Sequence, residues 1–126
     1  MNFHIYFFIG SIYATQSVFG AAFQYYSPID LQTFQKFYNL IPQSVEIKHG
    51  HTIDYCIGTN NCDEANLDVQ YLTALSQNTN TTFWFMDESK SGVAFLNYLI
   101  ELLELTQPPL VNSISYGQYE EVNLSK

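Results

Sequence analysis

Two carboxylates four residues apart, Glu64 and Asp68, form the pair in this chain whose spacing most favours chemistry. On a helix, side chains at positions i and i+4 share a face, and two like charges there repel by about 0.2–0.5 kcal/mol. A close second carboxylate raises one pKa of such a coupled pair, so that acid–base catalysis becomes available in mildly acidic surroundings. The alternative is an ordinary solvated helix face, which is the more common role of acidic pairs.

The two cysteines of the chain, Cys56 and Cys62, lie in a polar segment that is typical of a surface loop. We expect a small disulfide-closed loop if the chain is secreted, and two free thiols if it is cytosolic. His49 and His51 lie nearby, but His-x-His followed by this cysteine pair does not have the spacing of common zinc sites. We therefore favour plain loop histidines over a metal site.

Composition excludes several classes of partner. The chain has 126 residues, of which 47% are hydrophobic, so it forms one folded domain at most. Four basic residues against twelve acidic ones give a net charge of −8, which argues against nucleic acid and anionic membrane surfaces as partners. Asn80 and Asn123 each begin a glycosylation sequon, which has meaning only on a secretory route.

The first 29 residues contain no Asp, Glu, Lys or Arg, and residues 5–12 are mostly apolar. This pattern resembles the apolar region of a signal peptide, but no fixed positive charge precedes it and no clear cleavage site follows. The run is too short for a good membrane span, and no membrane contact beyond a signal segment is expected. A signal peptide, a truncated start and a buried core segment remain open. We divide the chain into an apolar start, residues 1–15, and a domain, residues 16–126.

Three helices and three strands are expected after this start. Ser27 and Pro28 begin the first helix, Asp63 caps a second helix that runs to about Ser76, and apolar residues of 95–105 form the third. Strands are expected at residues 45–47, 81–86 and 110–116. Their alternation with helices predicts an α/β fold with a parallel sheet, whose strand ends and helix starts collect ligands.

Four blocks of the sequence, in order within residues 16–121, resemble the sedolisin family of serine-carboxyl peptidases. The first reads Gln-Tyr-Tyr-Ser-Pro-Ile-Asp-Leu-Gln-Thr-Phe from Gln24 and is similar to the start of that family's catalytic domain. The others read Glu-Ala-Asn-Leu-Asp-Val-Gln-Tyr from Glu64, Thr-Thr-Phe-Trp from Thr81, and Pro-Pro-Leu-Val-Asn-Ser-Ile-Ser-Tyr-Gly from Pro108. The blocks from Glu64 and Pro108 are the specific ones.

The resemblance implies a partial subtilisin-like fold and a role for each matching residue. Glu64 matches the general base that takes the proton from the catalytic serine, and Asp68 matches the acid that orients this glutamate. Ser115, Tyr116 and Gly117 match a strand-end stretch that borders the substrate cleft, and an ordinary strand and turn is an equal alternative for them. Calcium is expected in the complete family domain, and no cofactor in this chain.

The resemblance also implies a function, and the sequence departs from the family in one respect that bears on it. The family's oxyanion aspartate lies in a Ser-Gly-Asp block and its nucleophile in a Gly-Thr-Ser block, and the sequence contains neither triplet. We expect a fragment of an acid-acting serine endopeptidase or tripeptidyl-peptidase, inactive alone, which acts on peptides or unfolded proteins. Its expected location is the secretory pathway, extracellular or lysosomal/vacuolar. The alternatives are a catalytically dead binding or inhibitory module, and an unrelated small secreted α/β binding protein.

Overall fold

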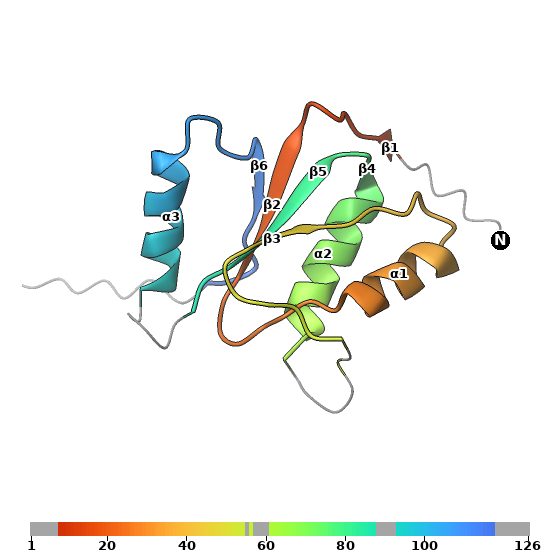
Figure 1. The fold of residues 1–126 in the computed structure, drawn as a ribbon, viewed down its shortest axis with the longest axis horizontal. Helices are drawn as coiled ribbons and strands as arrows, with labels where there is room; N and C mark the ends of the chain where they lie inside the picture. The colour runs from red at the N-terminus through yellow and green to blue at the C-terminus, as the bar shows by residue number, and fades with distance from the viewer. Residues whose placement is uncertain (1–7, 55, 57–60, 88–92, 118–126) are drawn as a thin grey trace, which may run out of the picture.

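The computed structural model describes residues 8–54, 56, 61–87 and 93–117, which form three helices and six strands (Figure 1). In chain order these are β1 (Phe8–Ile9), β2 (Thr15–Gly20), α1 (Pro28–Phe37), β3 (Glu46–Lys48), α2 (Asp63–Leu75), β4 (Ser76–Gln77), β5 (Asn80–Phe85), α3 (Ala94–Glu104) and β6 (Val111–Ser113).

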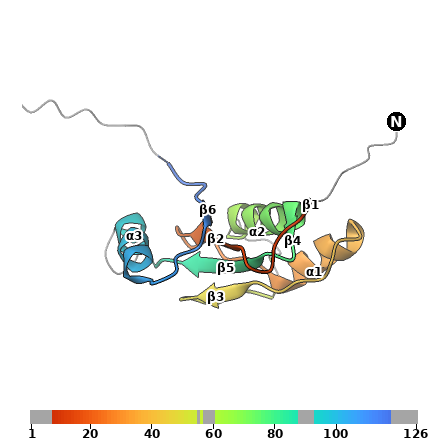
Figure 2. The same cartoon turned by 90° about the horizontal axis from the view of Figure 1, so that it is seen from above.

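The main sheet has four parallel strands in the order β3-β5-β2-β6. Figures 1 and 2 show α1 and α2 on one side of this sheet and α3 on the other. β1 and β4 form a separate short parallel pair. The predicted α/β class, with a parallel sheet flanked by helices, is confirmed.

Sequence reasoning missed three strands: the short pair β1 and β4, and β2, which lies between β5 and β6 in the main sheet. Residues 16–20, which follow the expected apolar start, are all buried. The expected division after residue 15 falls inside β2, which begins at Thr15. Polar Gln16 and Ser17 are buried here, and Gln16 Nε2 donates to Thr81 Oγ1 of β5 at 2.8 Å.

Each face of the sheet has its own apolar core. On the face toward α1 and α2, Val18 and Phe83 of the sheet form one core with Ala65 and Val69 of α2. The face toward α3 contributes a different set of buried residues, Phe19, Ala21, Trp84, Met86, Ala94 and Tyr98. Neighbouring positions on β2 and β5 thus alternate between the two cores, as expected for strands buried on both faces.

A polar triangle fastens β6 and α3 to β2. Ser17 Oγ donates to Asn112 Oδ1 at 2.7 Å, and Tyr98 Oη donates to the same oxygen at 2.8 Å. Ser17 Oγ and Tyr98 Oη lie 2.8 Å apart. Because Ser17 and Tyr98 are fully buried, these contacts supply the partners that their hydroxyls need away from water.

Some expected boundaries are correct and others are not. Ser27 caps α1 as predicted, since its Oγ accepts from the Asp30 amide. The N-cap of α2 is Cys62 and not Asp63, and no side-chain cap bond forms there. The last strand ends at Ser113 and does not continue to Tyr116. No helix in the described part of the chain combines the length and apolarity that a bilayer crossing needs.

Candidate active site

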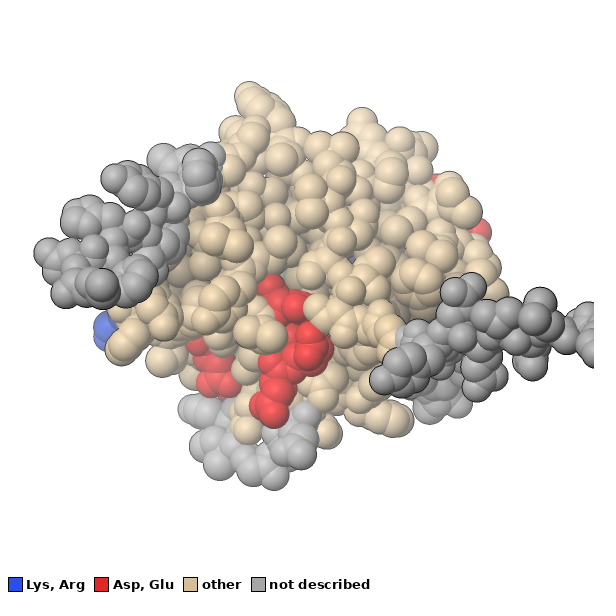
Figure 3. Space-filling model, turned by 180° about the vertical axis from the view of Figure 1, so that it is seen from behind, with Lys and Arg blue, Asp and Glu red and all other residues tan. Residues whose placement is uncertain are grey.

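Helix α2 carries the predicted acid pair near its first turn. Glu64 is the second residue of the helix and Asp68 follows one turn later, and both are half-buried. Ala65 and Val69, each the next residue, are buried in the core under the sheet. Their burial fixes the rotation of α2, so the carboxylates lie along one margin of the helix beside its apolar face. Figure 3 shows most of the acidic atoms visible from behind in the lower middle of that face.

The start of α2 is held by the segment that follows β2. The Glu64 amide donates to Gln24 Oε1 at 3.2 Å, and the Tyr25 amide donates to the Asn61 carbonyl at 2.7 Å. Cys62 is joined to Cys56 by a disulfide, with the two Cα atoms 5.8 Å apart. The Gln24 contact supplies a partner for one free amide of the first helical turn, since Cys62 gives no side-chain cap.

Asn66 ties the same turn of α2 to helix α1. Its Oδ1 accepts from the Ser27 amide at 2.9 Å, and its Nδ2 donates to Asp30 Oδ2 at 3.0 Å. The block from Gln24 and the block from Glu64, which carried the family resemblance separately, therefore meet at one place in the fold. This contact positions the first turn of α2 relative to the start of α1.

The two oxygens of Asp68 have different surroundings. Ser115 Oγ donates to Oδ1 at 2.8 Å, whereas Oδ2 is buried and has no hydrogen-bond partner among the described residues. Burial raises the pKa of Asp68 above its ordinary value, and the nearby charge of Glu64 raises it further. The hydrogen bond from Ser115 opposes both effects on the Asp68 pKa because it stabilises the ionised carboxyl group. Asp68 therefore keeps its proton to a higher pH than an ordinary aspartate does.

The segment that follows β6 reaches both the acid pair and the end of β2. Ser115 contacts Asp68, as described above, and its side chain is otherwise exposed. Tyr116 Oη accepts from the Ala21 amide at 3.1 Å and donates to the Ala21 carbonyl at 3.0 Å. Gly117 has open space on the side where a Cβ would lie. Sequence reasoning considered these three residues for backbone contacts, and it missed the side-chain bonds of Ser115 and Tyr116.

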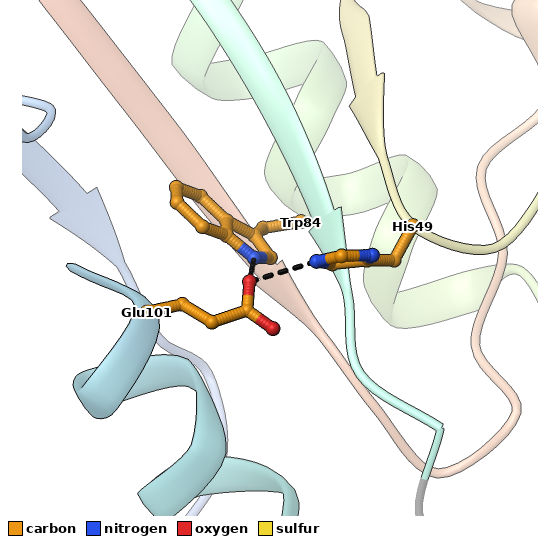
Figure 4. Close-up of polar contacts among 3 residues, drawn as sticks. All are labelled: His49, Trp84 and Glu101. Carbon is orange, nitrogen blue, oxygen red and sulfur yellow. Dashed lines mark hydrogen bonds and ion pairs between the residues drawn. The ribbon is translucent and has the colours of Figure 1, made fainter. Parts of the chain in front are cut away.

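A second polar cluster lies on the opposite side of the sheet (Figure 4). Glu101 Oε2 of α3 accepts from Trp84 Nε1 at 2.8 Å and lies 2.7 Å from His49 Nε2. Lys48 Nζ lies 4.5 Å from the centre of the Trp84 ring. His51 stacks on Tyr25, with ring centres 4.5 Å apart. His49 and His51 thus contact different partners, and no signal in the sequence linked His49 to Glu101.

Of two pockets formed by the described residues, only one borders a site described above. A pocket of about 490 Å³ lies where the loop after β3 meets α3, and its lining includes His49, His51, Phe85 and Glu101. A larger pocket of about 740 Å³ lies between α1 and the segment of residues 39–45. Neither pocket is lined by Glu64 or Asp68.

The two sequons differ in what the structure describes. Asn80 is exposed at the start of β5, and its Nδ2 lies 3.4 Å from the Ile12 carbonyl oxygen. Asn123 lies outside the described residues.

Comparison with known proteins gives two informative relatives. Tripeptidyl-peptidase 1 of Dictyostelium discoideum is 35% identical over 100 residues, which cover 77% of this chain and 16% of that protein. Physarolisin of Physarum polycephalum is 33% identical over 94 residues, which cover 75% of this chain and 15% of that protein. No protein-family model matches the chain, and no solved structure does. The chain spans about one sixth of the length of these curated relatives. Over three quarters of its length, this chain is homologous to a segment of the sedolisin serine-carboxyl peptidases.

Proposed function

We propose that this chain supplies the acid pair of a serine-carboxyl peptidase site, with Glu64 as general base and Asp68 as the group that orients it. The observation that supports this most directly is the environment of Asp68. Its buried Oδ2 and its raised pKa favour a shared proton next to Glu64. In the proposed reaction Glu64 accepts the serine proton as the acyl-enzyme forms.

A peptidase of this type works in acidic surroundings and on peptides or unfolded proteins. A disulfide and a net charge of −8 support a location in the secretory pathway, either extracellular or lysosomal/vacuolar. Nucleic acid is not a proposed partner. Calcium would belong to the complete domain, and none of the residues discussed here is assigned to it.

The chain alone is proposed to lack peptidase activity. The sequence contains no Gly-Thr-Ser or Ser-Gly-Asp triplet to match the family's nucleophile and oxyanion stabiliser. A base without its nucleophile loses most of the catalytic effect, because these groups act as a unit. Incubation of the chain with an unfolded polypeptide and with a tripeptide-releasing substrate, at about pH 3–6, should give no turnover. Turnover that is lost in Ser115→Ala would overturn this proposal, since Ser115 is bonded to the acid pair.

The roles of the two acids are testable in a chimaera. The segment of Dictyostelium discoideum tripeptidyl-peptidase 1 that matches this chain is replaced by the corresponding residues of this chain, and tripeptide release is measured. We expect the chimaera to be active. Glu64→Gln should lower kcat/KM by about a hundred- to ten-thousand-fold, the usual contribution of a general base.

The matched control in the chimaera is Asp63→Asn. Asp63 precedes Glu64 in the same turn of α2 and is exposed, so its loss removes the same charge without changing the acid pair. We expect Asp63→Asn to retain activity and Asp68→Asn to lose it together with Glu64→Gln. Full activity of Glu64→Gln in an active chimaera would rule out Glu64 as the base.

A further inference from the structure

Ser115 connects the segment after β6 to the acid pair on α2. Ser115 and Asp68 lie 47 positions apart in the sequence, and Ser115 Oγ donates a hydrogen bond to Asp68 Oδ1 at 2.8 Å. The other carboxyl oxygen of Asp68, Oδ2, is buried and has no hydrogen bond among the described residues. One carboxyl group therefore has one oxygen supplied with a donor and one without any partner.

A protonated carboxyl group has one hydroxyl oxygen and one carbonyl oxygen. A hydrogen bond donated to one oxygen favours that oxygen as the carbonyl acceptor and the other as the hydroxyl. A hydroxyl that donates to Oδ1 makes Oδ1 the acceptor. Oδ2 is then the oxygen that carries the proton, and burial disfavours leaving it as an unpaired anion. The geometry thus distinguishes the two oxygens before any substrate is present.

We infer that Ser115 is a positioning residue of the acid pair: its hydroxyl fixes Oδ1 of Asp68 as acceptor, so that Oδ2 holds the proton that Asp68 donates to Glu64. This inference rests on the proposed pairing of Glu64 with Asp68. In this role Ser115 acts on Glu64 through its bond to Asp68. The role differs from backbone contact with a peptide, for which the block from Pro108 was first considered.

The groups that bear on the Asp68 proton come from two elements. Glu64 of α2 supplies a nearby negative charge, and Ser115 supplies the hydrogen bond from the segment after β6. Burial against the rest of the fold is the largest effect and raises the Asp68 pKa. The opposite arrangement, in which Asp68 donates its proton from Oδ1 to Ser115, predicts the opposite response to loss of the hydroxyl.

The test is a pH titration of the full chain labelled with ¹³C at the aspartate carboxyl carbons, with Asp68→Asn to assign the resonance. If Ser115 donates to Oδ1, Ser115→Ala shifts the Asp68 midpoint upward and Ser115→Thr, which retains a hydroxyl, restores it. Ser113→Ala is the matched control, because Ser113 is a half-buried serine two residues earlier, at the end of β6. An unchanged or lowered midpoint in Ser115→Ala overturns the inference.

A second measurement asks whether Ser115 directs Asp68 toward Glu64. Glu64→Gln should lower the Asp68 midpoint, because the Glu64 charge raises it. This effect should be smaller when Ser115→Ala is also present, because the carboxyl group is no longer held in one orientation. Equal effects in both backgrounds overturn the positioning role.

These titrations need no turnover, so the two proposals fail separately. If the chimaera is active and the Asp68 midpoint does not change in Ser115→Ala, the proposed function stands and this inference is wrong. A chimaera whose activity does not depend on Glu64, combined with the predicted titrations, supports the contact between Ser115 and Asp68 and removes the catalytic role of the pair.

Discussion

At the residue scale, Asp68 shows how a half-buried carboxyl group links stability to pH. Burial and the charge of Glu64 raise the Asp68 pKa, so the folded chain binds this proton more tightly than the unfolded chain does. The resulting stabilisation is complete below the pKa of an unfolded aspartate, about 3.9. It is lost as the pH rises through the higher pKa of the folded state. An ionised Asp68 at neutral pH is therefore unfavourable for folding.

We predict that Asp68→Asn stabilises the chain at neutral pH and that this gain disappears in acid. The amide is neutral at every pH and still offers Ser115 an acceptor oxygen. Urea unfolding at about pH 7 and about pH 3.5, on the two sides of the transition, measures the difference. The exposed Asp63→Asn serves as the control and should change the unfolding free energy little. A loss of stability from Asp68→Asn that is equal at both pH values would contradict the prediction.

At the scale of elements, the packing of β2 against its neighbour β5 leaves no space for a side chain at Gly20. Gly20 lies at the end of β2, where an added Cβ would lie 2.7 Å from Cε2 of Phe83. Phe83 is fully buried and its ring has no room to move aside.

Gly20→Ala should therefore destabilise the chain by about 1–3 kcal/mol, the usual cost of overpacking. Gly117→Ala is the matched control, because a Cβ at Gly117 meets no atom within 4 Å. Denaturant unfolding of both variants measures the difference. Equal stability of the two would show that Phe83 relaxes more than its burial indicates.

The polar triangle of Ser17, Tyr98 and Asn112 predicts an order among substitutions. Asn112→Ala removes the acceptor of two hydroxyl groups and should cost about 2–3 kcal/mol, because Ser17 and Tyr98 can bond to each other but one of their hydroxyl hydrogens is left without an acceptor. Tyr98→Phe should cost only about 1 kcal/mol, because Ser17 still donates to Asn112. The exposed Tyr71→Phe should change little. Thermal or denaturant unfolding gives the order, and a larger loss from Tyr98→Phe than from Asn112→Ala would contradict it.

Sequence reasoning predicted the elements whose signals are local. The Ser27-Pro28 start of α1 and the aromatic strand β5 were predicted from adjacent residues, and both are present. β2 was missed because its residues neither alternate nor form an apolar run, and its buried Gln16 and Ser17 find partners 65 to 95 positions away.

For the acid pair, spacing and resemblance singled out both carboxylates before their surroundings were known. The surroundings of Asp68 were not predictable, since Ser115 lies 47 positions away and no local pattern links them. The contact of His49 with Glu101, 52 positions apart, was missed for the same reason.

At the scale of the whole molecule, α3 and β6 expose several large apolar side chains to solvent. Leu96, Ile100 and Leu103 recur at helical spacing on α3 and are exposed, with Leu103 at 86%. β6 is an end strand of the described sheet, and Val111 on it is exposed too. Apolar surface beside an open strand edge favours association between chains.

We predict that the isolated chain self-associates with rising concentration and that Leu103→Lys weakens this. The lysine places a charge on the apolar face of α3 without disturbing the buried core, since Leu103 is almost fully exposed. Leu75→Lys, at an exposed position of α2, is the control and should not change association. Sedimentation velocity over a concentration series measures both. A monomeric wild-type chain at every concentration would contradict the prediction.

The sheet order also determines when β2 can pair with each of its neighbours during synthesis of the chain. Thr15 of β2 is partnered by Asn80, and Gln16 is partnered by Val111, which the ribosome adds 95 residues later. At a synthesis rate of about 5–20 residues per second, β6 is complete roughly 5–20 s after β2. During that interval Phe19 and its neighbours have no completed sheet to enter, so the nascent chain is most vulnerable to misassembly before the segment that carries Ser115 emerges.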